Sequence, residues 1–234
     1  MTHHFGVLIP STNTTVETEL RHLPASYQAH FGRLLTSTPG RPFAPGRDED
    51  IDYQSKLLGT AKVEMLILAQ TSASLFADDY DEVVTRRMSA AAKGVPAVTS
   101  AQSIGRALQA LGARRIALVS PYSEDVNARA RRYYEKFGLE IVALDGFAAT
   151  DSYAIGNIAP SHARDAFARI DRPDIQAFVV PGANFPAMSA VAQWEREFGK
   201  PVVTSTQAGV WAAAKQLGGE RVPGFGRLLE TLPS

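Results

Sequence analysis

The chain has no cysteine, no net charge and no long apolar run, and each absence excludes a class of function. Without cysteine there can be no disulfide, no thiolate metal ligand and no thiol nucleophile. The 24 basic and 24 acidic side chains leave no net field to attract nucleic acid or an anionic membrane. No segment reaches the roughly 20 apolar residues of a membrane span, and the first residues lack the pattern of a signal peptide. We therefore expect a cytoplasmic protein that acts on a small metabolite, with no nucleic-acid or membrane partner.

What the sequence does contain is an internal repeat. The segment PAVTSAQ at residues 96–102 returns as PVVTSTQ at residues 201–207. Two further pairs lie at similar offsets, namely 63–74 with 175–186 and 5–13 with 115–125. Each segment is an apolar strand followed by small polar residues, which is typical of α/β proteins. The repeat predicts a duplicated α/β fold.

Strands and helices are predicted to alternate along the whole chain. We expect strands at 5–10, 30–35, 63–69, 95–99, 115–120, 139–144, 176–180 and 201–204. We expect helices at 14–23, 51–61, 78–93, 101–111, 124–136, 160–169, 185–198 and 206–217. This order favours two pseudo-symmetric halves, each a mostly parallel sheet flanked by helices, with a ligand cleft between them. The first half would be residues 1–112, completed by 205–234, and the second would be 113–204. Residues 36–50 are rich in proline and glycine, which predicts either a loop over the cleft or a plain connector.

The loops that follow the predicted strands carry an unusual number of hydroxyls and amides. They include Ser11, Thr12, Asn13, Thr71, Ser72, Tyr122, Asn184, Ser205 and Thr206, while Gly182 and Ala183 leave backbone N–H groups accessible. Such a set could bind a carboxylate or an oxyanion, because ligands of α/β folds sit beyond the carboxyl ends of the strands. The alternative for any single residue is helix capping, which Ser, Thr and Asn perform in most proteins. Their clustering at positions related by the repeat favours a ligand site.

Four segments resemble a known family. They are PSTNTTVE at 10–17, AQTSAS at 69–74, SPY at 120–122 and GFGRLL at 224–229. Together they are similar to the aspartate/glutamate racemase superfamily, and within it to the branch of maleate cis-trans isomerase and arylmalonate decarboxylase. The resemblance implies two pseudo-symmetric α/β halves, no metal or organic cofactor, and a small carboxylate held between the halves. It also implies chemistry through an enediolate or a cysteine adduct.

The chain departs from that family at its reactive positions. Gln70 and Gly182 stand where the family keeps cysteine, so no cysteine mechanism can operate. The resemblance assigns carboxylate binding and enediolate stabilisation to Thr71, Ser72, Tyr122 and the backbone at Ala183. It assigns substrate binding to Asn13, and we add Ser11 and Asn184 from the neighbouring loops. Gln70 could add a hydrogen bond, orient a water, or recognise an amide or carbonyl.

Tyr122 is the best-placed candidate for moving a proton. A phenol has a pKa of about 10, so it would need a lowered pKa to act as a base at neutral pH. Glu17 and Glu19 are interpreted as favourable charges at a helix N-terminus rather than as a catalytic pair. We therefore expect a cofactor-independent lyase, isomerase or hydrolase with Tyr122, Gln70 and the position of Gly182 at its centre.

Two questions stay open from the sequence. The alternative function is a catalytically inactive protein that binds small carboxylates or serves as an accessory module. The apolar segment 210–214 with Trp211 would suit a homodimer interface.

Overall fold

The computed structural model describes residues 2–35, 47–149 and 151–233, so residues 36–46 of the predicted loop lie outside the described part. Its first sheet has the strand order β2-β1-β3-β4 and its second the order β6-β5-β7-β8. All neighbouring strands are parallel. The two sheets have the same topology, with β5, β6, β7 and β8 in the places of β1, β2, β3 and β4. The predicted fold class, a pair of parallel α/β halves, is therefore confirmed.

The strands and helices alternate as the sequence predicted. The strands are β1 (His3–Pro10), β2 (Tyr27–Leu34), β3 (Met65–Leu68), β4 (Ala97–Thr99), β5 (Arg115–Ser120), β6 (Glu140–Gly146), β7 (Ala177–Val180) and β8 (Val202–Thr204). The α-helices are α1 (Val16–Leu20), α2 (Asp48–Thr60), α3 (Tyr80–Ala91), α4 (Ser100–Ala110), α5 (Glu124–Glu135), α6 (Ser152–Gly156), α7 (Pro160–Ile170), α8 (Val191–Phe198), α9 (Ser205–Leu217) and α10 (Arg227–Glu230). Two short 3-10 helices are η1 (Thr71–Leu75) and η2 (Met188–Ala190).

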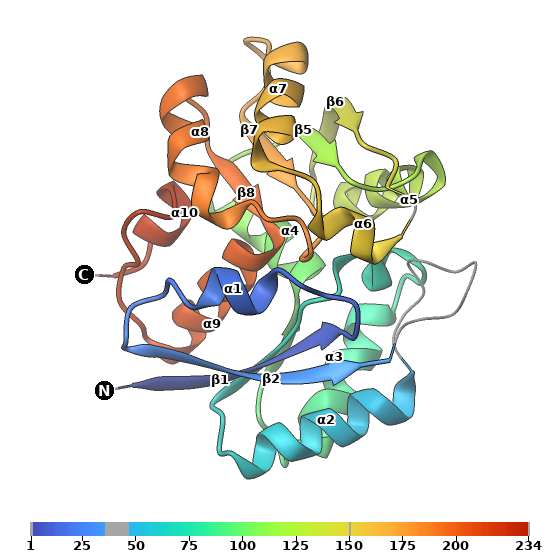
Figure 1. Ribbon diagram of the computed structural model, residues 1–234, viewed down its shortest axis with the longest axis vertical. Helices are drawn as coiled ribbons and strands as arrows, with labels where there is room; N and C mark the ends of the chain where they lie inside the picture. Colours follow the sequence, from blue (N-terminus) through green and yellow to red (C-terminus); the bar gives the residue numbers. More distant parts are fainter. Residues whose placement is uncertain (1, 36–46, 150, 234) are drawn as a thin grey trace.

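The first sheet buries both faces, because its strands are apolar on alternate sides. Leu8, Leu66 and Leu68 pack with residues of α2 and α3 in one cluster. Val7 and Ile67 point the other way, into a larger cluster that includes residues of the second half. Figure 1 shows α2 on one side of β1 and β2, with α1 and α9 on the other. The core is therefore continuous between the halves.

Helices α4 and α9 pack against each other between the two sheets. A Cβ at Gly209 of α9 would lie 3.2 Å from Ile67 Cγ2, so this glycine lets α9 approach β3 closely. Because α9 follows the last strand of the second sheet but contacts the first, the chain crosses back at residue 205.

Several element boundaries differ from the prediction. Strand β2 begins at Tyr27 rather than at residue 30, because β1 begins at His3 and the two pair along their full length. The helix expected at 185–198 begins only at Val191, after η2. The helix expected at 14–23 is confined to Val16–Leu20, and α6 and α10 were not expected.

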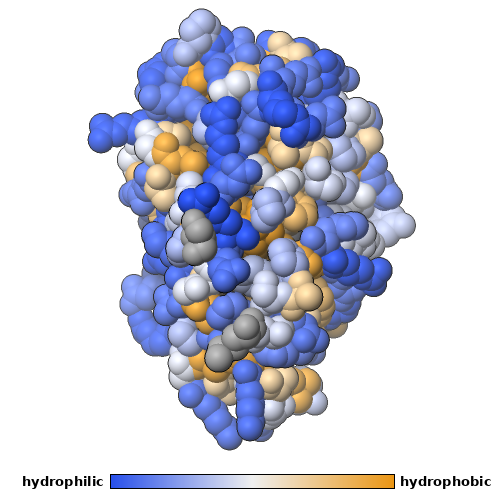
Figure 2. Space-filling view, turned by 90° about the vertical axis from the view of Figure 1, so that its left-hand side faces the viewer, coloured by the Kyte–Doolittle hydropathy of each residue, from blue (hydrophilic) through white to orange (hydrophobic). Residues whose placement is uncertain are grey.

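The segment proposed as a dimer surface is buried inside the chain. Trp211 is 4% exposed, and Val210, Ala213 and Ala214 are buried as well. Figure 2 shows the face that carries both termini, where hydrophilic side chains dominate and apolar ones form small separate patches. Residues 210–214 therefore pack in the core and are not available to a partner. The homodimer stays a prediction, and this segment is no longer an argument for it. No helix in the described ranges is long and apolar enough to cross a membrane.

Candidate functional site

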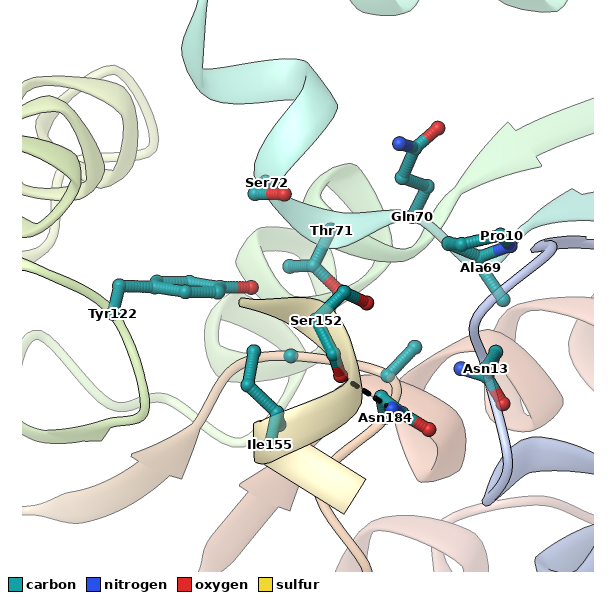
Figure 3. A pocket seen from close by; sticks show the side chains of 12 residues that line it. Pro10, Asn13, Ala69, Gln70, Thr71, Ser72, Tyr122, Ser152, Ile155 and Asn184 are labelled. Carbon is teal, nitrogen blue, oxygen red and sulfur yellow. Dashed lines mark hydrogen bonds between the residues drawn. The ribbon is translucent and has the colours of Figure 1, made fainter. Parts of the chain in front are cut away.

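The ends of β1, β3, β5 and β7 surround one small pocket that both halves line. Its walls are Pro10, Asn13, Ala69, Gln70, Thr71, Ser72, Tyr122, Ser152, Ile155, Gly182, Ala183 and Asn184 (Figure 3). The pocket is partly open, and its cavity volume is about 30 Å³, which holds only a few water molecules. A ligand of several heavy atoms therefore requires some of these walls to move.

The pocket brings together most of the residues singled out from the sequence. Four of them, Ser11, Thr12, Ser205 and Thr206, do not line the pocket. The Ser11 backbone N–H donates to the Leu34 carbonyl at 2.7 Å while its carbonyl accepts from Arg33. Ser152 and Ile155 of α6 were missed. Both lie on the short helix that comes after β6. The sequence alone did not predict this helix, and only the tertiary fold places it over the pocket.

Asn13 caps a helix with one end of its side-chain amide and turns the other end toward the pocket. Its side-chain oxygen caps α1 by accepting from the backbone N–H groups of Thr15 and Val16, each at 3.0 Å. Its side-chain nitrogen is buried and has no partner among the described residues. Figure 3 shows this nitrogen directed toward Ser152 and Asn184. Capping therefore fixes the amide so that its two N–H donors remain for the pocket.

Asn184, by contrast, uses its side chain to hold the pocket walls together. Its oxygen accepts from the Thr14 backbone N–H at 2.8 Å, and its nitrogen donates to the Ser152 carbonyl at 2.6 Å. Its own carbonyl accepts from the Thr15 hydroxyl at 2.8 Å. A Cβ at Gly156 would lie 2.5 Å from Thr14 Oγ1 and 3.0 Å from Asn184 Nδ2, so glycine is needed for α6 to pack here. Asn184 thus ties α6 of the second half to the loop that follows β1.

Tyr122 is buried, and burial raises the pKa of its phenol because the ionised form would be poorly solvated. A hydrogen bond with the Thr71 side chain opposes this rise but does not cancel it. A general base would need a lowered pKa, whereas the pKa of Tyr122 is raised. At neutral pH, Tyr122 is therefore a protonated donor.

The Tyr122 hydroxyl lies next to Gly182. Gly182 has φ +98°, a conformation that side-chain-bearing residues rarely adopt. A Cβ on Gly182 would lie 3.4 Å from the Tyr122 hydroxyl and 3.0 Å from Pro121 Cγ. A side chain at position 182 would therefore press on Pro121 and contact the phenol.

The other donors of the pocket are hydroxyls and backbone amides. The Thr71 hydroxyl forms a buried hydrogen bond of 2.8 Å with the Ser205 hydroxyl. The backbone N–H groups of Ser72 and Ala183 donate to no acceptor within the described ranges, and both residues line the pocket. One amide from each half is thus available to an oxygen of a ligand. This arrangement can stabilise negative charge that develops on a carboxylate or enediolate oxygen.

Gln70 is buried with the rest of the loop, but its amide does not join the other polar groups. Figure 3 shows its side chain extending away from Thr71 and Asn184. Its role as a catalytic residue remains a prediction.

Glu19 is a buried carboxyl group beside the site that sequence reasoning took for an ordinary helix charge. It is 7% exposed, and its Oε1 accepts from the backbone N–H groups of Ala187 and Met188 at 2.8 and 2.7 Å. The Thr206 side chain also forms a hydrogen bond with this carboxyl group. Desolvation raises its pKa from 4.5 to about 7 against these hydrogen bonds.

Comparisons with known proteins agree with this arrangement. A family model described as arylmalonate decarboxylase matches residues 42–229. The maleate isomerase of Pseudomonas putida is 28% identical over 242 residues, covering 97% of each chain. The arylmalonate decarboxylase of Bordetella bronchiseptica is 30% identical over 143 residues, covering 59% of this chain and 60% of that protein.

Solved structures extend the similarity to the whole fold. A variant of the maleate isomerase Iso from Pseudomonas putida S16, crystallised with maleate, has a TM-score of 0.90 at 26% identity, covering 98% of each chain. A maleate cis-trans isomerase variant from Nocardia farcinica with a covalently bound succinylcysteine intermediate has a TM-score of 0.86 at 26% identity, covering 99% of each chain. With a family model that matches most of its length, this cysteine-free chain belongs to the maleate isomerase and arylmalonate decarboxylase family of the aspartate/glutamate racemase superfamily.

Proposed function

We propose that the protein is a cofactor-independent enzyme that acts on a small carboxylate or related carbonyl compound by stabilising an enediolate-like oxyanion. The reaction would be that of a lyase, isomerase or hydrolase. The observation that carries this proposal is the Tyr122 hydroxyl, which is held by Thr71 and lies beside Gly182 in the pocket between the halves. It puts a proton donor where a side chain at position 182 would otherwise reach.

A thiol adduct is excluded for this chain. The Nocardia farcinica relative has been captured with a succinylcysteine intermediate, whereas the present chain has no cysteine anywhere in its sequence. The donors that remain are the Asn13 side-chain nitrogen, the Tyr122 hydroxyl and the amides of Ser72 and Ala183. In a water-excluded pocket such fixed donors stabilise developing charge more than they do in water.

Tyr122 acts as the acid in this proposal. When a bond to the α-carbon breaks, by loss of carbon dioxide or by transfer of the α-proton to a solvent water, its electron pair enters the enediolate. The α-carbon is then reprotonated: its new C–H bond forms as the Tyr122 O–H bond breaks, the negative charge moves to the phenolate, and the phenolate regains its proton from solvent water. Thr71 stabilises that phenolate, consistent with its lowering effect on the Tyr122 pKa. A phenol with a raised pKa still suffices, because the carbon of an enediolate is a much stronger base.

The test is proton exchange and turnover with a defined panel. The protein is incubated in deuterated water with maleate, phenylmalonate and 2-phenylpropionate, and each is followed by proton NMR. We expect deuterium at the α-carbon of 2-phenylpropionate, or conversion of one of the diacids, at a rate above that of a Tyr122→Phe variant. If no member of the panel reacts, the enzymatic proposal fails for this class of compounds.

A second candidate is a protein that binds small carboxylates without turning them over. One observation favours it: of the described residues that line the pocket, only Tyr122 has a titratable side chain, and its pKa is raised. Calorimetric titration separates the two candidates. Binding of maleate or phenylmalonate that depends on Asn13, without exchange or turnover, would favour the binding protein.

A further inference from the structure

Two serines that the repeat makes equivalent differ in their contacts. Ser100 is the first residue of α4 and Ser205 is the first residue of α9, and each follows a threonine whose hydroxyl caps the helix. Both serines are 1% exposed. The Ser205 hydroxyl bonds to Thr71, whereas the Ser100 hydroxyl has no partner in the described ranges.

The reason for the difference is the residue that each serine would meet. Gln70 and Gly182 are equivalent in the repeat, so the counterpart of Thr71 is Ala183, which has no hydroxyl. A hydroxyl pair therefore forms on one side of the pseudo-two-fold only. That side is the one where Thr71 also bonds to Tyr122.

Tyr122, Thr71 and Ser205 thus form a buried chain of three hydroxyls. Each hydroxyl has one proton to donate and can accept as well. In the protein without a ligand Thr71 donates to Ser205, so it can only accept from Tyr122, and the Tyr122 proton then points away from a ligand. If Ser205 donates to Thr71, then Thr71 donates to the Tyr122 oxygen, and the Tyr122 proton is free for the ligand. Such chains strengthen cooperatively when they end on a negative charge.

We propose that Ser205 is a positioning residue that, through the Thr71 hydroxyl, directs the Tyr122 O–H toward an anion in the pocket. Its importance for turnover rests on the proposed function, in which Tyr122 is the acid. Its effect on the Tyr122 phenol does not, because the hydroxyl chain exists in the protein without a ligand. The two can therefore be tested separately.

The experiment measures the ionisation of the phenol directly. Difluorotyrosine, whose phenol ionises nearer neutral pH than that of tyrosine, is incorporated at position 122 of the full chain and titrated by absorbance. In this background we expect Ser205→Ala to raise the phenol pKa by about half a unit to one unit, because the phenolate loses the far end of its hydrogen-bonded chain. Ser205→Thr keeps the hydroxyl and should titrate like the parent. Ser100→Ala, the matched control, should not shift it.

The Thr71→Val variant provides a second test, which is still informative if Ser205→Ala fails to fold. It removes the link between Ser205 and Tyr122, so it should raise the phenol pKa by itself and abolish any further effect of Ser205→Ala. Equal shifts from Ser100→Ala and Ser205→Ala, or a Ser205→Ala shift that persists in the Thr71→Val protein, would overturn the proposal. No shift in any variant would overturn it as well.

Turnover is measured in the chain with natural tyrosine, using the deuterium-exchange panel. Loss of kcat in Ser205→Ala, with KM little changed and with rescue by Ser205→Thr, would support the positioning role during catalysis. Absence of turnover in the parent protein would count against the proposed function alone, since the titration would still decide the role of Ser205.

Discussion

The Tyr122 hydroxyl lies 3.4 Å from the point where a Cβ on Gly182 would stand. The two residues come from the ends of neighbouring strands, β5 and β7, and a Cβ at position 182 would be in van der Waals contact with the phenol and in tighter contact, at 3.0 Å, with Pro121 Cγ. Gly182 also has a positive φ, so its backbone is adapted to having no side chain. A cysteine introduced at position 182 would therefore press on Pro121 and contact the phenol, and replacing Gln70 and Gly182 together by cysteine should not recreate a thiol mechanism.

We expect Gly182→Ala to destabilise the protein more than Gly94→Ala does. Gly94 has a similar φ of +93°, but a Cβ added there would meet nothing within 4 Å, so it reports backbone strain alone. Strain of this kind costs about 1–3 kcal/mol. The excess at position 182 should come from contact with Pro121 Cγ, which the new Cβ would meet at 3.0 Å. Urea unfolding of both variants measures the difference, and equal losses would show that Pro121 can move aside.

Tyr122→Phe should leave the fold intact and lower turnover about a hundredfold or more, which is the usual size of a proton-transfer contribution. Its matched control is Tyr134→Phe. Tyr134 is fully buried and its hydroxyl has no partner in the described ranges, so removing that hydroxyl should be neutral or slightly stabilising. Exchange and turnover are compared at equal protein concentration. A Tyr122→Phe protein as active as the parent would exclude the phenol as the acid.

Asn13→Asp should keep the cap of α1 but weaken the binding of carboxylates. Aspartate retains an oxygen that can accept from the Thr15 and Val16 N–H groups, while the buried donor facing the pocket becomes a second oxygen. We expect the dissociation constant for maleate to rise at least about tenfold. Asn13→Ala, which loses cap and donor together, should also lower stability by about 1 kcal/mol. Undiminished maleate affinity in Asn13→Asp would show that this amide does not contact the ligand.

Glu19→Gln should change how stability depends on pH. The pKa of Glu19 is raised from 4.5 to about 7 in the folded state, so the folded protein binds more protons than the unfolded chain between these values. The parent therefore loses up to about 3 kcal/mol from this group as pH rises from 4.5 to 7, with no further change above. Relative to the parent, Glu19→Gln should become more stable across the same interval.

The control for this experiment is Glu17→Gln. Glu17 lies close to Glu19 on α1, but it is partly exposed and pairs with Arg33 at the surface. Denaturant unfolding between pH 4.5 and 8 should show no comparable gain for this variant. If the Glu19→Gln and parent curves stayed parallel, Glu19 would have an ordinary pKa in the folded protein.

The duplicated architecture, the strand ends that carry polar residues, and the loss of both family cysteines could all be read from the amino-acid sequence. These features depend on local patterns, because apolar strands followed by helices and small polar residues are recognisable without any knowledge of packing. Ser72, Tyr122 and Ala183 could be placed near one cleft for the same reason, since the carboxyl ends of parallel strands share an edge.

Which contacts each of these residues makes depends on the packed fold. It commits Asn184 to hydrogen bonds with α6 and the first loop, turns one end of Asn13 to a helix cap and the other to the pocket, and leaves Ser11 outside. It also raises the pKa values of Tyr122 and Glu19, because burial is a property of the packed chain and not of the residue type. Contacts between residues more than a hundred positions apart, such as Thr71 with Ser205, arise only when α9 folds back against the first half.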